Sequence, residues 1–198
     1  MESKQLIIAV SREFGSGGHC IAEELARRFA LPLCDRNILE EIADEKNVDS
    51  RNLEKYDELP KNHLFSRTVR GFSNSPEEQI ANMQFDFLRK KAEEGASFVI
   101  VGRCAETILK GNPGLITIFV LGDMDAKIKR IAGLHLISRA EAERMIWRHD
   151  RKRKAYHNHY CEMKWGDSRN YDLCINSNKL GIERTTDTLE QYIRERMK

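Results

Sequence analysis

The amino-acid sequence predicts an α/β fold, in which a parallel sheet carries helices on both faces. Two observations lead to this prediction: short apolar runs alternate with segments of helical periodicity, and a glycine-rich turn separates the first run from the first helix. The 198 residues fit one domain with a single core, and they contain no repeat or low-complexity tract. We therefore predict a single domain over residues 1–198.

The first predicted elements are a strand, a turn, a helix and a second strand. Leu6–Val10 is a continuous apolar run, typical of a strand buried on both faces. Residues 21–29 repeat apolar side chains at helical spacing, and Pro32 ends that helix. Residues 33–34 are a short predicted strand, after which Asp35 can cap another helix. The apolar face of that helix comprises Ile38, Leu39, Ile42 and Ala43.

A polar stretch, residues 48–75, interrupts this alternation. We predict that it is an irregular insertion over one face, on the side where an acceptor substrate would bind. Pro76 then opens a helix, because proline is favoured in a first helical turn. Phe98–Val101 and Leu115–Leu121 are the next apolar runs, and both are predicted strands.

The last third of the chain alternates in the same way. Asp123–Leu134 has helical periodicity, and Ser138 with Glu141 forms a capping-box pattern that opens a long basic helix. Asp172–Ile175 is predicted to be the last strand, and Ile182–Ile193 the closing helix.

The glycine-rich turn, residues 11–18, has the composition of a phosphate-binding loop. Its three glycines permit positive φ angles and a close backbone approach to a ligand. The helix that follows presents N-terminal N–H groups, which carry about half a positive charge and favour anions. The residues predicted to bind phosphate groups are Gly15, Ser16, Gly17, Gly18, His19 and Cys20. The alternatives are a tight turn without a ligand and, less favoured, a dinucleotide-binding motif, which would need glycine at position 20.

The loop departs from the common pattern G-x-x-x-x-G-K-[ST]. When the strand ends are aligned, Arg12 takes the place of the first glycine and Gly18 that of the lysine. His19 and Cys20 replace the residues that normally include a magnesium-binding hydroxyl. Positive charge for phosphoryl transfer must therefore come from elsewhere, and Arg12 at the loop mouth is one candidate.

A dense basic cluster follows the capping box. It comprises Arg144, Arg148, Arg151, Lys152, Arg153 and Lys154. Spacings of four and three place Arg144, Arg148 and Arg151 on one helix face. Guanidinium groups suit phosphate oxygens, so residues 138–170 are predicted to be a lid that closes over phosphate. A solvated charged face is the alternative, and a nucleic-acid patch is disfavoured because the net charge is only +2.

The lack of long apolar runs, the cysteine count and the histidine spacing limit the cellular location and the metal sites that we predict. No apolar run approaches the ~20 residues that span a bilayer, and the polar start lacks the features of a signal peptide. Five cysteines without a Cys-x-x-Cys pair indicate reduced thiols, so we predict a cytoplasmic protein without a membrane partner. His149, His157 and His159 do not share one helix face, and no metal site is predicted from them.

The chain resembles the cytidylate kinase-like family, a divergent branch of the nucleoside monophosphate kinases, over nearly its whole length. The motifs that carry the resemblance are residues 11–18 with Ile21-Ala22, Asp35-Arg36, Val101-Gly102-Arg103, Trp165–Ser177 and Leu180–Glu183. The resemblance implies a P-loop NTPase fold with a five-stranded parallel sheet and a helical lid. It also implies transfer of the γ-phosphoryl group of ATP, with Mg²⁺, to a nucleoside monophosphate.

The resemblance further implies roles for individual residues. Arg103 would contact the acceptor nucleotide, and Arg36 would belong to the same side. Arg148, Arg151 and Arg153 would belong to the lid, and Asn176 and Ser177 would lie near the adenine. Two departures from the family pattern concern catalysis, because Gly18 replaces the loop lysine and Val101 replaces an aspartate at the end of the third strand.

The role of Asp35 and the function itself stay open at the level of sequence. Asp35 is a candidate for orienting the acceptor or a magnesium-bound water, and equally a helix N-cap. A nucleotide- or anion-binding regulator that lost catalysis is favoured by the missing lysine, whereas the arginine cluster favours the enzyme. A small-metabolite kinase of the same fold is a third possibility. No feature of the sequence specifies an oligomeric state.

Overall fold

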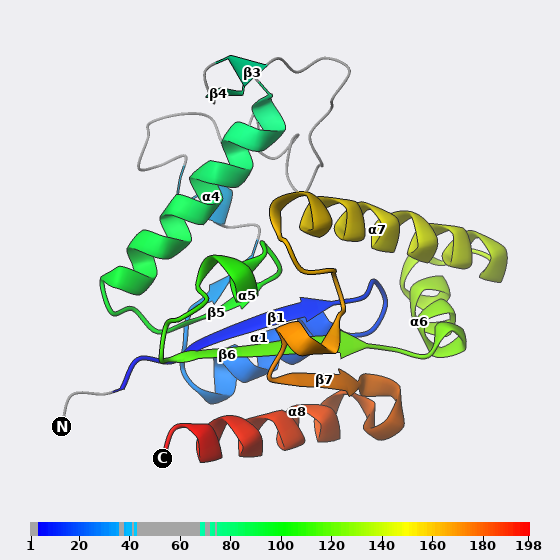
Figure 1. The fold of residues 1–198 in the computed structure, drawn as a ribbon. Coiled ribbons are helices and arrows are strands. Elements are labelled where there is room, and N and C mark those ends of the chain that lie inside the picture. The colour runs from blue at the N-terminus through cyan, green and yellow to red at the C-terminus, as the bar shows by residue number, and fades with distance from the viewer. Residues whose placement is uncertain (1–3, 36–37, 41, 43–67, 70–71, 74) are drawn as a thin grey trace.

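A computed structural model describes residues 4–35, 38–40, 42, 68–69, 72–73 and 75–198 (Figure 1). Five strands form one sheet in the order β2-β5-β1-β6-β7, and every neighbouring pair is parallel. The strands are β1 (Ile7–Arg12), β2 (Leu33–Cys34), β5 (Phe98–Val101), β6 (Leu115–Leu121) and β7 (Leu173–Asn176). The predicted α/β class and five-stranded parallel sheet are therefore confirmed.

The first strand is central because its residues alternate between two apolar layers. Ile8 and Val10 pack with α1 (Gly18–Arg28) and α8 (Ser177–Arg196) on one face. Ile7 and Ala9 pack on the other face with α4 (Pro76–Glu93), and with α5 (Ala105–Ile108). Figure 1 shows these two pairs of helices on opposite sides of the sheet. Burial of both faces explains why the strands read as continuous apolar runs.

Two helices form a hairpin beyond the carboxyl ends of β1 and β6 (Figure 1). They are α6 (Met124–His135) and α7 (Arg139–Tyr160), and they pack through Ile128, Ile131, Ala142 and Ile146. The predicted capping box is present, with the Ser138 hydroxyl and the Glu141 carboxylate each accepting from the other's backbone N–H. The hairpin falls partly in the predicted lid region.

The start of α8 differs from the sequence-based expectation. α8 begins at Ser177, five residues before the predicted start, because the Asn176 side chain accepts a hydrogen bond from the Asn178 N–H. Gly181, at φ 79° and ψ 168°, then interrupts the helical backbone just before Ile182. A short 3₁₀ helix, η1 (Ser168–Asn170), precedes β7.

The predicted insertion, residues 48–75, lies mostly outside the described residues. Its described part contains the antiparallel pair β3 (Thr68–Val69) and β4 (Phe72–Ser73). Residues 38–40 and 42 are helical, and Ile38, Leu39 and Ile42 are buried, as predicted. Arg36 and Ala43 lie outside the described residues.

Within the described part of the chain, none of the helices combines the length and the apolarity that a membrane crossing requires.

Candidate functional site

The glycine-rich loop connects the end of β1 to the start of α1 and is tightly packed against its neighbours. Gly15 and Gly17 both have φ of 81°, which only glycine adopts without strain. A Cβ atom on Gly15 would lie 3.1 Å from Ile131 Cγ1, and one on Gly17 would lie 2.7 Å from Arg130 Nη1. The absence of a Cβ atom at these glycines therefore allows side chains of α6 to pack against the loop, in addition to any ligand at the N–H groups.

Gly18 shows why the loop has no lysine at this position. A Cβ atom there would lie 2.5 Å from the Cβ atom of Arg12. Because Arg12 stands where the common pattern has glycine, its side chain fills the space that a residue at position 18 would need. A single change in packing therefore explains both Arg12 and Gly18, the two residues that depart from the common loop pattern.

The side chain of Ser16 forms hydrogen bonds within the loop. The buried Ser16 hydroxyl donates to the Glu13 carbonyl at 2.9 Å and accepts from the Gly18 N–H at 3.3 Å. The Ser16 carbonyl accepts from the Ser177 hydroxyl at 2.5 Å. These bonds shape the turn and connect it to α8. The N–H groups of the first turn of α1 after Gly18 lack an intrahelical acceptor, as at any helix N-terminus, and can bind an anion.

Positive charge reaches the loop from α6, which the sequence analysis did not single out. Arg130 Nη1 donates to the Gly15 carbonyl at 2.8 Å. Lys127, one turn earlier, is buried, and its Nζ lies 3.0 Å from Glu13 Oε2 and 3.1 Å from Asp150 Oδ2. The spacing of three residues was the available signal, because it places both side chains on the same side of the helix.

Asp150 and its neighbours join α7 to the loop. The Phe14 N–H donates to Asp150 Oδ1 at 2.6 Å, and the Phe14 ring stacks on His149 with centroids 4.2 Å apart. The Arg153 guanidinium lies over the same ring at 5.6 Å from its centroid. Burial, followed by the positive charge of Arg153 and then of Arg148, lowers the pKa of His149. The helix α7 is therefore in contact with the loop in this structure.

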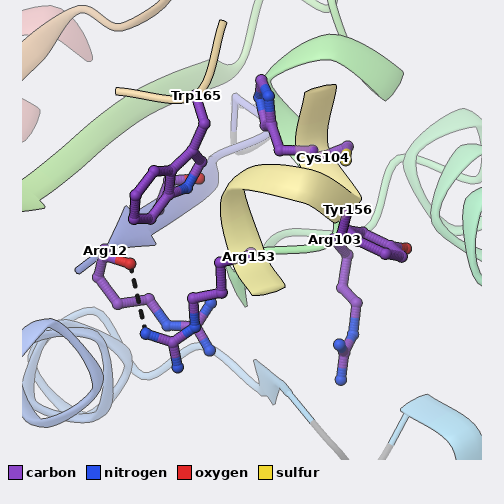
Figure 2. Close-up of a pocket in the computed structure, with 9 residues that line it drawn as sticks. Arg12, Arg103, Cys104, Arg153, Tyr156 and Trp165 are labelled. Carbon is purple, nitrogen blue, oxygen red and sulfur yellow. Dashed lines mark hydrogen bonds between the residues drawn. The ribbon is translucent and has the colours of Figure 1, made fainter. Parts of the chain in front are cut away.

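A pocket lies at the carboxyl ends of β1 and β5, beside the loop (Figure 2). It opens to solvent, and three arginines line it: Arg12 at the end of β1, Arg103 after β5 and Arg153 from α7. Arg153 Nη1 lies 3.4 Å from the Arg12 carbonyl. The other lining residues are Ser11, Gly102, Cys104, Tyr156, His157 and Trp165. In doubly wound folds, ligands bind outside the carboxyl ends of the strands, as here.

One wall of the pocket contains a buried acid–imidazole pair. His157 Nε2 lies 2.6 Å from Glu106 Oε1, and Glu106 Oε2 accepts from the Ser11 hydroxyl at 3.3 Å. Burial alone would lower the pKa of His157, but hydrogen bonds with Cys161 and Glu106 raise this pKa to about 10. A hydrogen bond with Cys104 lowers the pKa of Cys161 to about 5, with burial acting in the opposite direction. The wall therefore contains an imidazole and a thiol whose charges depend on each other.

The structure brings some predicted site residues together and separates others. Arg12, Arg103 and Arg153 share the pocket, next to the loop. Arg148 and Arg151 are exposed on the opposite face of α7 and do not line it. Arg144 is exposed on that same face, so the three arginines do lie together as their spacing predicted, but away from the pocket.

The remaining predicted residues border the loop. Asp35 Oδ2 lies 3.4 Å from His19 Nδ1, and both belong to the edge where β2 ends and α1 begins. His19 and Cys20 are exposed in the first turn of α1. Asn176 donates to Asp123 Oδ1 at 2.7 Å, so it joins the start of α8 to the start of α6.

Comparisons with known proteins agree with this geometry. A family model described as the cytidylate kinase-like family matches residues 7–179. A solved structure described as an uncharacterized protein from Eubacterium ventriosum is 42% identical, with a TM-score of 0.77, and the match covers 96% of this chain and 99% of that one. No curated protein matches the chain.

More distant solved structures share the fold alone. A shikimate kinase from Bacteroides thetaiotaomicron is 14% identical with a TM-score of 0.54, and the match covers 96% of this chain and 98% of that one. A shikimate kinase from Acinetobacter baumannii, solved with shikimate, is 13% identical with a TM-score of 0.53, over 98% and 95% of the two chains. The fold is therefore that of the P-loop kinases, as predicted.

Proposed function

Because the chain belongs to the cytidylate kinase-like family, we propose that it transfers the γ-phosphoryl group of ATP to a nucleoside monophosphate. The observation that carries this proposal is the convergence of Arg12, Arg103 and Arg153 on one pocket beside the loop. Guanidinium groups bind phosphate oxygens through paired N–H donors and stay charged at all physiological pH values. Three of them in one small space suit an acceptor that carries a phosphate group.

The aromatic lining of the pocket supports a nucleotide over a smaller anion. Trp165 lines the pocket and is held edge-on against Phe119, with ring centroids 5.3 Å apart. A fixed indole offers an apolar face on which a base can stack. The acceptor phosphate would then lie among the arginines and the base against Trp165.

The donor side fits the phosphates of ATP through backbone groups. The N-terminal N–H groups of α1 would hold the donor phosphates, with Arg130 fixing the loop by its bond to the Gly15 carbonyl. Mg²⁺, when bound with ATP, neutralises phosphate charge. The Ser16 hydroxyl is already engaged within the loop, so Asp35, next to His19, is the better candidate to orient a magnesium-bound water.

Phosphoryl transfer would depend on positioning and charge. Arg12 lies between the loop and the pocket, so its guanidinium is suited to stabilise the charge that passes from donor to acceptor. Arg153 contacts both Phe14 of the loop and the Arg12 carbonyl, and would bring α7 over the reacting groups.

A kinase for a small anionic metabolite is the second candidate. The pocket encloses little space in this structure, which favours a compact acceptor. Its arginines would bind a carboxylate as well as a phosphate.

The two candidates are separated by a turnover assay of the full chain with ATP and Mg²⁺. The acceptor panel contains CMP, UMP, AMP, GMP and shikimate, and the products are identified by mass. We expect a nucleoside diphosphate, with kcat/KM about 100-fold lower in Arg103→Gln and unchanged in Arg89→Gln, an exposed arginine on α4. Phosphorylation of shikimate alone would favour the second candidate. ATP binding without any product would instead favour a nucleotide-binding regulatory protein that has lost catalysis.

A further inference from the structure

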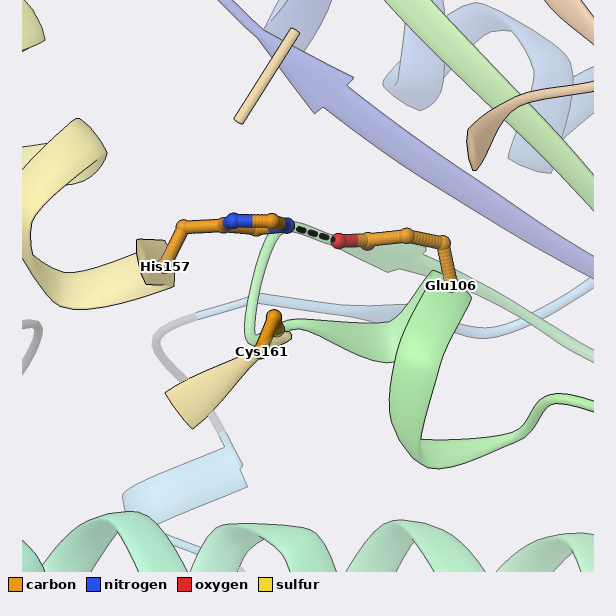
Figure 3. A group of neighbouring side chains, drawn as sticks. All are labelled: Glu106, His157 and Cys161. Carbon is orange, nitrogen blue, oxygen red and sulfur yellow. Dashed lines mark hydrogen bonds and ion pairs between the residues drawn. The ribbon is translucent and has the colours of Figure 1, made fainter. Parts of the chain in front are cut away.

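Three potential metal ligands meet behind the arginine pocket (Figure 3). They are Glu106 of α5, His157 near the end of α7, and Cys161, which caps that helix. One ligand atom from each lies within 4.8 Å of the others, and all three residues are buried. The sequence analysis missed this group because the three residues come from two helices and share no short motif.

The surroundings of the group favour a soft metal ion. Phe85, Tyr156 and Ala81 form an apolar cluster with Cys161 and with Cys104. The Cys104 thiol hydrogen-bonds to Cys161, so a second sulfur lies next to one of the three ligands. Thiolate and imidazole are ligands that zinc prefers, whereas magnesium takes oxygen ligands and keeps several waters.

We propose that Glu106, His157 and Cys161 form a binding site for one Zn²⁺ ion. One ligand atom of each residue lies within 4.8 Å of the others, so modest side-chain movements can bring all three to zinc bond lengths of ~2.0–2.3 Å. His157 Nε2 and Glu106 Oε1, which lie 2.6 Å apart, would separate as the ion enters between them. The Cys104 thiol, which contacts Cys161, is a candidate donor for a fourth position. A glutamate and a thiolate together balance the charge of the ion, which a buried site requires.

Metal binding replaces the hydrogen bonds of the group. Zn²⁺ takes the place of the proton between His157 Nε2 and Glu106 Oε1, and of the proton on the Cys161 sulfur where the thiol carries one. These protons pass to solvent, as they do when zinc binds thiol and imidazole ligands in general. No oxidation or reduction is involved.

Neighbouring groups already hold the ligands in place. The Ser11 hydroxyl donates to Glu106 Oε2 at 3.3 Å, and the Cys161 N–H donates to the His157 carbonyl at 2.8 Å. Such supporting bonds orient ligands and commonly change metal affinity by about 10–100-fold. An ion here would join α5 to the end of α7 and so fix the pocket wall that Cys104 and His157 form. The site does not depend on the identity of the phosphoryl acceptor.

The test uses the full chain, kept reduced, stripped with a chelator and then titrated with Zn²⁺ alone against a competing chromophoric chelator. Co²⁺ serves as the spectroscopic probe, because a bound thiolate gives a sulfur-to-cobalt charge-transfer band. We expect one equivalent of zinc, no displacement by excess Mg²⁺, and a charge-transfer band in the Co²⁺ complex. Melting temperature should rise with added zinc, since the ion binds the folded chain.

Matched variants identify the ligands. Cys161→Ser and His157→Gln should each weaken zinc binding by more than about 100-fold, since loss of a ligand exceeds the effect of a supporting group. Cys174→Ser and His159→Gln change exposed residues of the same types and should bind zinc as the unchanged chain does. Circular dichroism of the metal-free variants checks that each one folds.

Two results would overturn the zinc site. One is a Co²⁺ complex of the unchanged chain without a charge-transfer band. The other is equal zinc affinity in the site variants and their controls. Neither result bears on phosphoryl transfer, which the turnover assay measures separately.

Discussion

The two sides of the carboxyl end of β1 use positive charge differently. On the loop side, Lys127 is enclosed by Glu13 and Asp150, and Arg130 donates to the Gly15 carbonyl. On the pocket side, Arg12, Arg103 and Arg153 line a space that a ligand can enter. The difference indicates that the basic residues of α6 hold the loop in shape, whereas those of the pocket are suited to bind an anion. Variants on the two sides should therefore differ in whether stability or activity changes.

The largest effect is expected from Lys127→Met. Removing the ammonium leaves two carboxylates facing each other in a partly buried site, and breaking a buried ion pair in this way costs about 3 kcal/mol. The free energy of unfolding, measured with urea, should fall by that amount. Lys129→Met, at an exposed position on the same helix, is the control and should change it by less than ~0.5 kcal/mol.

Adding a side chain at position 18 of the loop should also destabilise the protein. In Gly18→Ala the new Cβ would meet the Arg12 Cβ at 2.5 Å, and overpacking of this kind costs about 1–3 kcal/mol. The double variant Arg12→Gly with Gly18→Ala should recover most of the lost stability, because the clash is gone. If the single variant unfolds at the same urea concentration as the unchanged chain, Arg12 does not fill this space.

The two faces of α7 should differ in activity by a smaller amount. Arg153→Gln should lower kcat/KM about tenfold, by the loss of one charged hydrogen-bond donor at the pocket. Arg148→Gln and Arg151→Gln should each change it less than about twofold, because both side chains are exposed on the opposite face. Equal losses in all three variants would mean that the whole arginine cluster closes over the substrate.

The smallest expected effect is a loss of stability at acidic pH, which depends on His149. The pKa of His149 is lower in the folded chain than its ordinary value of 6.5, so the unfolded chain binds the proton more readily. Stability should therefore decline as the pH falls below about 6.5 and through the folded pKa. His149→Phe keeps an aromatic ring against Phe14 and should flatten this part of the stability–pH curve. An unchanged curve would assign the acid sensitivity to other groups.

Much of the fold could be predicted because its signals are local. Pro76 after Ser75 marks the start of α4, and Ser138 with Glu141 marks the start of α7, each through contacts within a few residues. The continuous apolar runs predicted the strands, because helices cover both faces of the sheet. The boundary at Ser177 was missed because it depends on the Asn176 side chain and on the bend at Gly181.

The site was only partly predictable, and α7 shows why. Ala142, Ile146 and Tyr156 are buried and recur at helical spacing, and Arg153 continues their stripe. Arg148 and Arg151 lie on the other side of the helix. The helical spacing already separates them from Arg153, but the density of basic residues led to all three being assigned to one site. Lys127 could not be recognised in the same way, because its two carboxylate partners are 114 and 23 residues away along the chain.

Calorimetry with CMP measures directly whether the arginine pocket binds a nucleoside monophosphate, as we propose. We expect one CMP per chain, binding at least tenfold weaker in Arg103→Gln and in Arg153→Gln, and unchanged binding in Arg89→Gln. ATP should still bind to Arg103→Gln, because the loop holds the donor through backbone groups. Equal CMP affinity in all variants, or heat from ATP with none from any nucleoside monophosphate, would contradict the claim.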